Sequence, residues 1–454
     1  MARSVAQSRA VSDIAAPQPR ARERVIVASL VVALLGTAWL VDPFAQAGFD
    51  APKRLIALIA AAVAGAAALW NADARALRDT FRRRDALAPA ARYSLLAALA
   101  VMAGLLLATL VAQQPTSSAS TLRLMLLIAL FVPLGASRVF DGAGGRRVLT
   151  AALLAAAVNA VISLLQSAGL DLSFVASQPG GRYPTGALLG NEAYVALSGA
   201  LMGAAGLALG LSASTSRRRW IGWALLALGL AVMLANRQRT SLIAVFAAAA
   251  VLAAVRWRVL RWAPHATAAL VVLLGLCASV PALRALTWAR VPVTVDTWQQ
   301  VTTYRLGAWA AATEMIATKP WTGYGPGSYA SQSQVQRFAA EIKLQRRLPP
   351  PQPATTFVQA HQEYLQLAAE AGLPVLVALL AALGWLLGGL LRLARDASVA
   401  RTQLEAQLLL GVLVAGAVAA LAWFPLQIPF TAIVLLLACG RAWRLLAAER
   451  EIGA

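Results

Sequence analysis

The segment TTFVQAHQEYLQLAAEAG at 355–372 places a histidine, an amide, a carboxylate and a phenol side by side, just before a long apolar run. Its His361 is one of only two histidines in the 454 residues of the chain. A neutral imidazole accepts a proton near neutral pH, with an ordinary pKa of about 6.5, so His361 is a candidate general base. A second interpretation stays open, in which His361 is a hydrogen-bonded polar residue at the start of a helix.

The spacing of this segment predicts a helix from about Phe357 onward. On such a helix His361 shares one face with Tyr364, and with the alanines that follow it, so that face would pack inward. His361 would then stand at the outer end of the face, where it could border a cavity. Glu363 and Glu370 are interpreted as a solvated face.

Four arginines are candidates for binding an anion on the same side as His361: Arg182, Arg237, Arg239 and Arg305. A lone arginine at the end of a membrane span often extends along apolar surface to reach water, and this interpretation stays open for each. Arg237 and Arg239 share the very short turn NRQRTSL. Two guanidinium groups in such a turn, on the side where positive charge is disfavoured, indicate an anionic partner such as a polyprenyl diphosphate.

The acidic residues predicted on this side form no D-x-D or similar pair. A hard divalent cation that bridges a diphosphate prefers clustered carboxylates, so we expect a metal-independent site without a cofactor. GYGPGS at 323–328 is not a G-x-G-x-x-G dinucleotide loop, because no strand precedes it; a tight turn is the favoured interpretation.

Composition indicates what must position these residues. The chain is 59% hydrophobic and 13% charged, whereas soluble domains have about 25% charged residues. A span needs about 20 mostly apolar residues, and we count about twelve such stretches. They lie near 25–41, 54–70, 93–112, 121–137, 148–169, 186–211, 219–235, 240–255, 266–281, 372–393, 404–423 and 427–446. The sequence therefore predicts an all-α, polytopic membrane protein.

The net charge of +21 raises the possibility of a nucleic-acid partner, but its distribution argues against one. The arginines gather in alternate loops, at 75–92, 138–147, 217–219, 256–261, 392–401 and 441–444. If all twelve spans are real, these loops fall on one side, which is the positive-inside pattern, and both termini are cytoplasmic. The basic residues indicate topology and contact with membrane lipids rather than nucleic acid.

Three parts follow from this topology. Residues 1–281 carry the first nine spans, 282–371 form one large external loop, and 372–454 carry the last three spans. The loop is too long for a structureless connection, so we expect helices in it and a function for it. An amphipathic helix is predicted at 299–318, ended by Lys319-Pro320, followed by a glycine-rich turn at 321–329 and a second helix at 330–347.

The external loop resembles the O-antigen ligase/polymerase family in YRLGAWAAATEMIATKPWTGYGPGSY at 304–329 and FVQAHQEYLQLAAEAGLP at 357–374. The family has an arginine on a helix, a Pro-x-x-Gly-x-Gly-x-Gly turn, and a His-Asn/Gln-x-Tyr-Leu motif followed by Glu-x-Gly. Arg305, the turn 320–327, and the segments 361–365 and 370–372 match these parts. RQRTSL resembles the family's Ser-Arg-Gly-type turn at Arg239, and GGRYPTGALLGNEAY resembles another family segment at Arg182 and Asn191.

The resemblance implies a GT-C-like fold of about 12 transmembrane helices, in the bacterial inner membrane, with the active site in the large periplasmic loop. It implies an inverting glycosyl transfer from an undecaprenyl-diphosphate-linked glycan to a sugar hydroxyl of lipid A–core, without a metal. The implied base is His361. The implied diphosphate-binding residues are Arg239 and Arg305, with Arg182 and Arg237 in helping roles. The implied supporting residues are Gln362, Tyr364, Asn191 and Lys319.

A ligase is favoured over two other activities in the same family. The paired Arg-x10-Gly pattern of the polymerases is absent at each external arginine, and protein O-oligosaccharyltransferases often carry further C-terminal sequence. The ligases' arginine–leucine spacing of four is also not reproduced from Arg237 or Arg239. Both alternatives therefore remain open behind the ligase.

A transporter or flippase of lipid-linked glycans is the alternative from another class. Transporters place ionisable residues or broken helices near the midplane and show internal repeats. Here the charged residues Arg123, Glu192 and Glu405 lie at span ends, and the elaborate element is external. This pattern disfavours transport.

Overall fold

The structure is a computed structural model, and it describes residues 21–42, 49–69, 87–170, 185–256, 302–349 and 356–452, together with residues 172 and 299. Within these ranges the chain is helical and has no strand. The helices are α2 (Ala21–Trp39), α3 (Ala51–Leu69), α5 (Pro89–Leu110), α6 (Pro115–Ala129), α7 (Phe131–Gly135), α8 (Ala143–Ser167), α9 (Glu192–Ser212), α10 (Ser216–Ala235), α11 (Arg239–Arg256), α15 (Leu306–Thr318), α16 (Tyr329–Leu344), α17 (Glu363–Ala371), α18 (Leu373–Asp396), α19 (Ala400–Ala419) and α20 (Pro429–Ile452), with 3-10 turns η2 (Arg138–Asp141) and η3 (Ala187–Leu189).

Ten stretches of helix in the described ranges are long and apolar enough to cross a membrane. They confirm the predicted all-α, polytopic class. The predicted span at 25–41 corresponds to α2, which has three charged residues in its first turn and is not among the ten, although its Ile26 and Leu30 are fully buried in the bundle. The predicted span at 266–281 lies outside the described residues.

Helix α9 is the most buried span, and it crosses α10 at very short range. Gly206 on α9 and Gly222 on α10 meet at this crossing. A Cβ added at Gly222 would lie 2.6 Å from the Gly206 carbonyl oxygen, so no larger residue fits there. Small residues that let backbones approach are the usual means by which helices associate inside a membrane.

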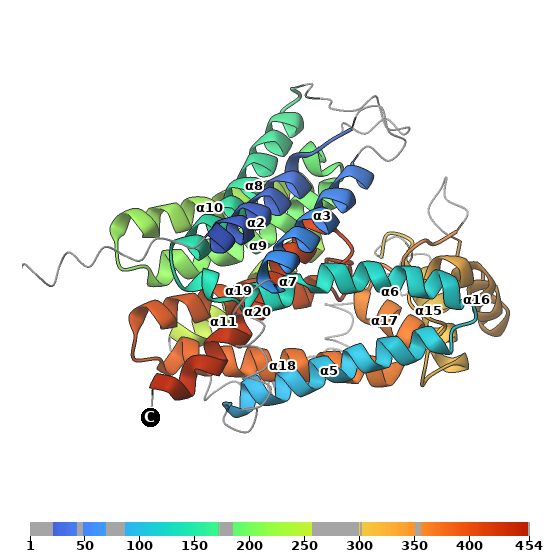
Figure 1. The fold of residues 1–454 in the computed structure, drawn as a ribbon. Helices are drawn as coiled ribbons and strands as arrows, with labels where there is room; N and C mark the ends of the chain where they lie inside the picture. Colours follow the sequence, from blue (N-terminus) through green and yellow to red (C-terminus); the bar gives the residue numbers. More distant parts are fainter. Residues whose placement is uncertain are drawn as a thin grey trace, which may run out of the picture.

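Helices α15, α16 and α17 gather at one end of the bundle, which we call the capped end (Figure 1). They share a small apolar core of their own, in which Met315, Tyr329 and Phe357 are buried. The cap also contacts the membrane helices, because α17 packs against both α18 and α5. The cap is therefore seated on the bundle rather than separate from it.

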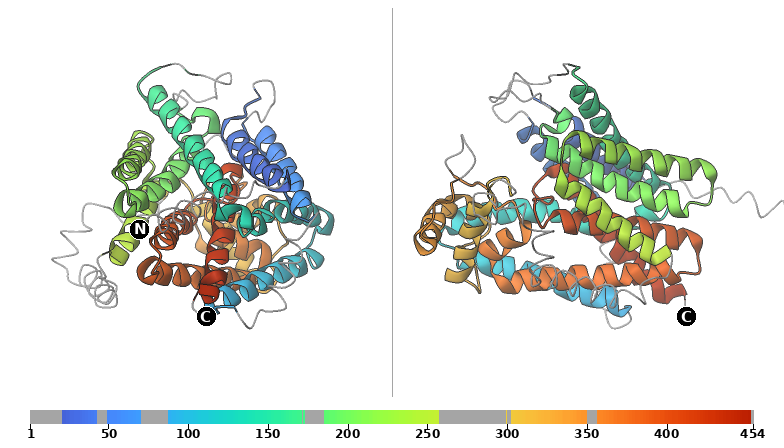
Figure 2. Two further views of the ribbon diagram at one scale, coloured as in Figure 1. Left: turned by 60° about the vertical axis from the view of Figure 1, so that its left-hand side comes forward. Right: turned by 180° about the vertical axis from the view of Figure 1, so that it is seen from behind.

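At the other end of α18 the chain turns into α19, and α20 ends nearby; Figure 2 shows this region from two further directions. We call it the basic end, because arginines of the predicted basic loops gather there. Arg441 donates from Nε to Glu405 Oε1 over 2.6 Å and from Nη1 to Asp141 Oδ1, and Arg401 donates to the Asp141 carbonyl over 2.9 Å. These buried and half-buried charges are neutralised locally.

Candidate functional site

Helix α17 begins at Glu363, so the prediction of a helix from Phe357 is wrong. Local hydrogen bonds explain the difference, because they occupy backbone groups that a helix would need. Ser333 Oγ donates to the Phe357 carbonyl over 2.6 Å, and the Ala360 N–H donates to Gln366 Oε1 over 3.1 Å. His361 therefore stands in a turn before the helix, with a φ of 53° in the left-handed region.

His361 faces two aromatic rings from the segment 420–426, which is part of the connection between α19 and α20. Its ring centroid lies 5.2 Å from that of Trp423 and 5.2 Å from that of Phe424. Its Nδ1 atom is buried and has no hydrogen-bond partner among the described residues. Burial, and then the positive charge of Arg305, lower the pKa of His361 to about 4, so the imidazole is neutral at neutral pH.

Arg305 is the residue immediately before α15, and its side chain reaches the same segment. Its Nη1 donates to the Ala422 carbonyl over 2.7 Å, and its guanidinium carbon lies 4.5 Å from the centroid of the Trp423 ring. Burial lowers the pKa of Arg305 to about 10, which leaves it charged at neutral pH. The fold thus brings two predicted site residues, 56 positions apart in the sequence (361 − 305), into contact with one tryptophan.

The segment 420–426 was not predicted as part of the site. Glu363 fastens it to α17: its N–H donates to the Ala420 carbonyl over 2.9 Å, and its Oε2 accepts from the Leu426 N–H over 3.1 Å. The interpretation of Glu363 as a solvated residue is therefore wrong, and burial raises the pKa of its carboxyl group to about 8. The available signal was the aromatic pair Trp423-Phe424 in a short connection between two spans.

Glu370 is also not a solvated residue, since only 5% of it is exposed. Its carboxylate accepts from the N–H groups of Gly327 and Tyr329, over 2.9 and 3.2 Å, and from Gln366 Nε2 over 3.2 Å. A tight turn leaves N–H groups without backbone partners, and burying them requires an acceptor. Glu370 is that acceptor, which explains why a carboxylate is buried here.

The glycine-rich turn at 321–329 is a tight turn packed on α6, as the favoured interpretation held. Gly325 and Gly327 have φ values of 105° and 79°, which L side chains rarely adopt. A Cβ at either position would lie 2.4 Å from a hydroxyl oxygen of α6, that of Ser118 or that of Thr121. The turn therefore fixes the cap to the membrane bundle.

Arg239 is the first residue of α11, and Arg237 lies just before it with a φ of 52°. Both are exposed, and neither forms an ion pair with a described carboxylate. Helix α11 packs against α19, and Leu252 lies beside Gly411. Because the two helices run in opposite directions, Arg239 lies toward the same end as the segment 420–426. Arg182 lies outside the described residues.

Each of the four supporting residues has a partner among the described residues. Gln362 is the N-cap of α17 and accepts from the Leu365 N–H, while the Tyr364 hydroxyl donates to the Ala417 carbonyl over 2.8 Å. Asn191 is the N-cap of α9 and accepts from the Ala193 N–H over 2.8 Å. Lys319 places its Nζ 4.8 Å from the centroid of the Tyr324 ring. Gln362 and Tyr364 adjoin His361 in sequence and fix α17 beside it.

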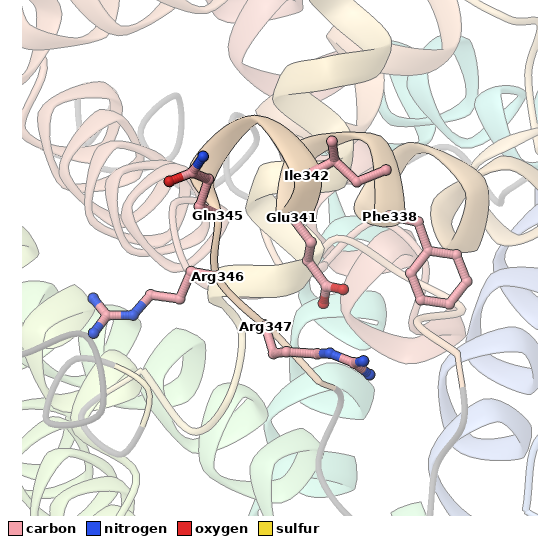
Figure 3. A pocket seen from close by; sticks show the side chains of 6 residues that line it. All are labelled: Phe338, Glu341, Ile342, Gln345, Arg346 and Arg347. Atoms are coloured by element: carbon pink, nitrogen blue, oxygen red, sulfur yellow. The ribbon is translucent and has the colours of Figure 1, made fainter.

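Elsewhere in the cap lies a hollow of about 460 Å³, and Figure 3 shows the side chains that line it. It is lined by Phe338, Glu341, Ile342, Gln345, Arg346 and Arg347, none of which is a predicted site residue. The guanidinium groups of Arg346 and Arg347 extend to opposite sides of it, so they do not converge on one anion. In the part of the chain that the structure describes, no group of three or more histidine, cysteine or acidic residues could hold a metal ion.

Comparison with known proteins bears on the region that carries these residues. Residues 224–380 match the family model described as O-antigen ligase, and no curated protein matches the chain. The matched range includes Arg237, Arg239, Arg305 and His361, whereas the segment 420–426 lies beyond it. Members of this family are membrane enzymes that act on lipid-linked glycans. This match confirms the resemblance inferred from the sequence: residues 224–380 are similar to the O-antigen ligase family.

Proposed function

We propose that the chain is an O-antigen ligase of the bacterial inner membrane. It would transfer a glycan from undecaprenyl diphosphate to a sugar hydroxyl of lipid A–core, at a site on the periplasmic side. One observation carries this proposal: a neutral histidine with an unpartnered Nδ1 and a half-buried arginine cation meet at Trp423, at the capped end of the bundle. A proton acceptor beside a cation suits a reaction in which a hydroxyl group is deprotonated while an anion leaves.

In the proposed step, the acceptor hydroxyl oxygen attacks the anomeric carbon of the donor sugar. The new glycosidic C–O bond forms as the C–O bond to the diphosphate breaks, and the anomeric configuration inverts. The hydroxyl proton passes to His361. General-base assistance of this kind typically contributes about 10²–10⁴ in rate.

The arginines would bind the diphosphate and stabilise the charge that grows on it as it leaves. Arg305 and Arg239 have the leading roles, with help from Arg237 and Arg182. Arg305 is the best supported, since it is half-buried and its guanidinium is bonded to a carbonyl rather than to a carboxylate, so its charge remains available to an anion.

The donor would also tune the base. A pKa of about 4 makes a weak base, and part of the lowering comes from the charge of Arg305. A bound diphosphate offsets that charge, and therefore raises the pKa of His361 toward its ordinary value of about 6.5. The imidazole becomes a better base when the donor is in place.

The test is His361→Ala in the native host, with lipopolysaccharide examined on a gel. A ligase loses all glycan-capped lipid A–core and accumulates the lipid-linked polymer. A polymerase instead leaves core that bears a single repeat unit, and unchanged lipopolysaccharide contradicts both activities. Gln334→Ala, at an exposed position of α16 in the same cap, is the control and should leave the gel pattern unchanged. The amount of each variant in the membrane is measured in parallel.

A further inference from the structure

We infer that Trp423 positions both Arg305 and His361, and that Glu363 holds in place the segment that carries it. The inference rests on the proposed function, because it takes those two residues as the groups that act on the substrates. The family match ends at residue 380, so it assigns nothing to the segment 420–426. The assignment comes from contacts alone.

The first set of contacts fixes the guanidinium of Arg305. The Ala422 carbonyl accepts one of its N–H groups over 2.7 Å, and the Trp423 ring lies 4.5 Å from its central carbon. Among aromatic side chains, the indole of tryptophan attracts a cation over its face most strongly, and the attraction increases where water is excluded. A guanidinium has five N–H donors in a fixed plane. Holding that plane against a ring therefore sets the direction of the donors that remain for an anion.

The second set fixes the imidazole of His361. Trp423 and Phe424 stack with their centroids 4.8 Å apart and their planes 16° from parallel, and both lie 5.2 Å from the imidazole. The paired rings form an apolar wall that keeps water from this side of the histidine. The ionisable groups around the imidazole are few. Arg305 is the charged group that acts on it, and Glu363 lies two residues further along the chain. The segment 420–426 contains no charged residue.

The third set shows why the segment keeps its place. Glu363 binds both of its ends, through the Ala420 carbonyl and the Leu426 N–H. The neighbouring Tyr364 hydroxyl bonds to the Ala417 carbonyl at the end of α19. Since Glu363 follows His361 by only two residues, the histidine and the wall that it contacts are fastened to each other at short range.

The experiment compares Trp423→Leu with Trp423→Phe, using the full chain purified into lipid with a lipid-linked glycan donor and lipid A–core acceptor. Trp423→Leu should lower kcat by roughly 10²-fold, the scale expected when reacting groups are misplaced by about an ångström. Trp423→Phe retains a ring for both contacts and should stay within about threefold of the parent. Trp321→Leu removes a tryptophan of the cap that is 74% exposed, and it should change neither kcat nor kcat/KM.

A pH profile distinguishes positioning from a merely structural role. Opening the aromatic wall exposes the imidazole to water and so raises the pKa of His361. The acid limb of kcat/KM should therefore move to higher pH in Trp423→Leu and stay in place in Trp423→Phe. An unchanged kcat in Trp423→Leu overturns the inference. Equal losses in the leucine and phenylalanine variants also overturn it, because they would mean that the indole N–H, and not the ring, is required.

Two further arms complete the design. If Trp423→Leu does not fold, Glu363→Ala takes its place and should lower kcat, with the same shift of the acid limb to higher pH. Glu363→Gln keeps an acceptor oxygen and should leave kcat and the acid limb as in the parent. Equal behaviour of the two Glu363 variants overturns the inference. His361→Ala separates the two proposals. Full activity in His361→Ala overturns the proposed function, whereas loss in His361→Ala together with a normal Trp423→Leu overturns only the positioning role.

Discussion

Two arginines at opposite ends of the bundle show how the surroundings of a charge decide its use. At the basic end, Arg441 is 6% exposed and binds two carboxylates, Glu405 and Asp141. At the capped end, half-buried Arg305 binds a carbonyl and lies over the Trp423 ring, with no described carboxylate as its partner. A cation that is already neutralised has little charge left for a ligand, whereas Arg305 keeps its charge beside a neutral histidine. The comparison separates an arginine that holds helices together from one suited to bind an anion.

The largest expected effects come from Arg305→Ala, which should lower activity, and from Arg441→Ala, which should lower stability. In the proposed reaction, removing Arg305 takes away a cation that stabilises the leaving diphosphate, so glycan transfer should fall by roughly 10²–10³-fold with little change in stability. Removing Arg441 leaves Glu405 without this partner and leaves Asp141 with only the longer contact to Arg444, at 3.8 Å, so the free energy of unfolding should fall by about 1–3 kcal/mol. Turnover and denaturant unfolding of both purified variants provide the measurements. Lost turnover in a fully stable Arg441→Ala protein would contradict the distinction.

The pH dependence of the parent enzyme sharpens the contrast further. In the free enzyme the pKa of His361 is about 4, so the imidazole is neutral above that pH and charged below it. The value of kcat/KM should therefore fall by about tenfold per unit below pH 4. The acid limb of kcat should lie at higher pH, because in the proposed complex the diphosphate would offset the charge of Arg305.

Arg305→Gln is the control for the pH profile. Without the cation the pKa of His361 rises, so the acid limb of kcat/KM should move to higher pH, and the separation between the two limbs should shrink. Steady-state rates measured across the acid range give both limbs. A parent enzyme whose kcat/KM titrates above pH 6.5, the ordinary value for histidine, would contradict this account of the base.

Lys343→Ala should have the smallest effect, although it removes a cation from the capped end itself. Lys343 is paired with Glu314 and its side chain is 65% exposed. Exposed ion pairs contribute about 0–1 kcal/mol, so stability should hardly change and turnover should stay the same. Loss of activity in this variant would mean that position at the capped end, rather than an uncompensated charge, defines the site.

The sequence predicted the membrane bundle well, because hydropathy is a property of neighbouring residues. Apolar runs of sufficient length correspond to ten described helices, and the tight turn at 321–329 follows from its glycines. The predicted start of α17 was wrong, since the side chains of Ser333 and Gln366 form hydrogen bonds with backbone groups of the segment before it. Those competing bonds do not appear in a periodic pattern.

The candidate site was predictable only in part. His361 and Arg305 were found from residue type and family resemblance, and the structure brings them to one tryptophan. Glu370 was misjudged, because the N–H groups that it accepts from lie 41 and 43 positions earlier in the chain. Trp423 was missed for a similar reason: it follows His361 by 62 positions (423 − 361), beyond any local spacing rule.

By itself, the sequence determined the class of protein, the helices that span the bundle and the residue types able to move a proton or bind an anion. These follow from composition and short-range periodicity, which are sums over adjacent residues. Only the tertiary structure decided which charges are compensated. Arg441 meets partners 36 and 300 positions away, while Arg305 meets a carbonyl 117 positions away. Charge compensation depends on contacts between distant segments, and packing of the helices alone brings those segments together.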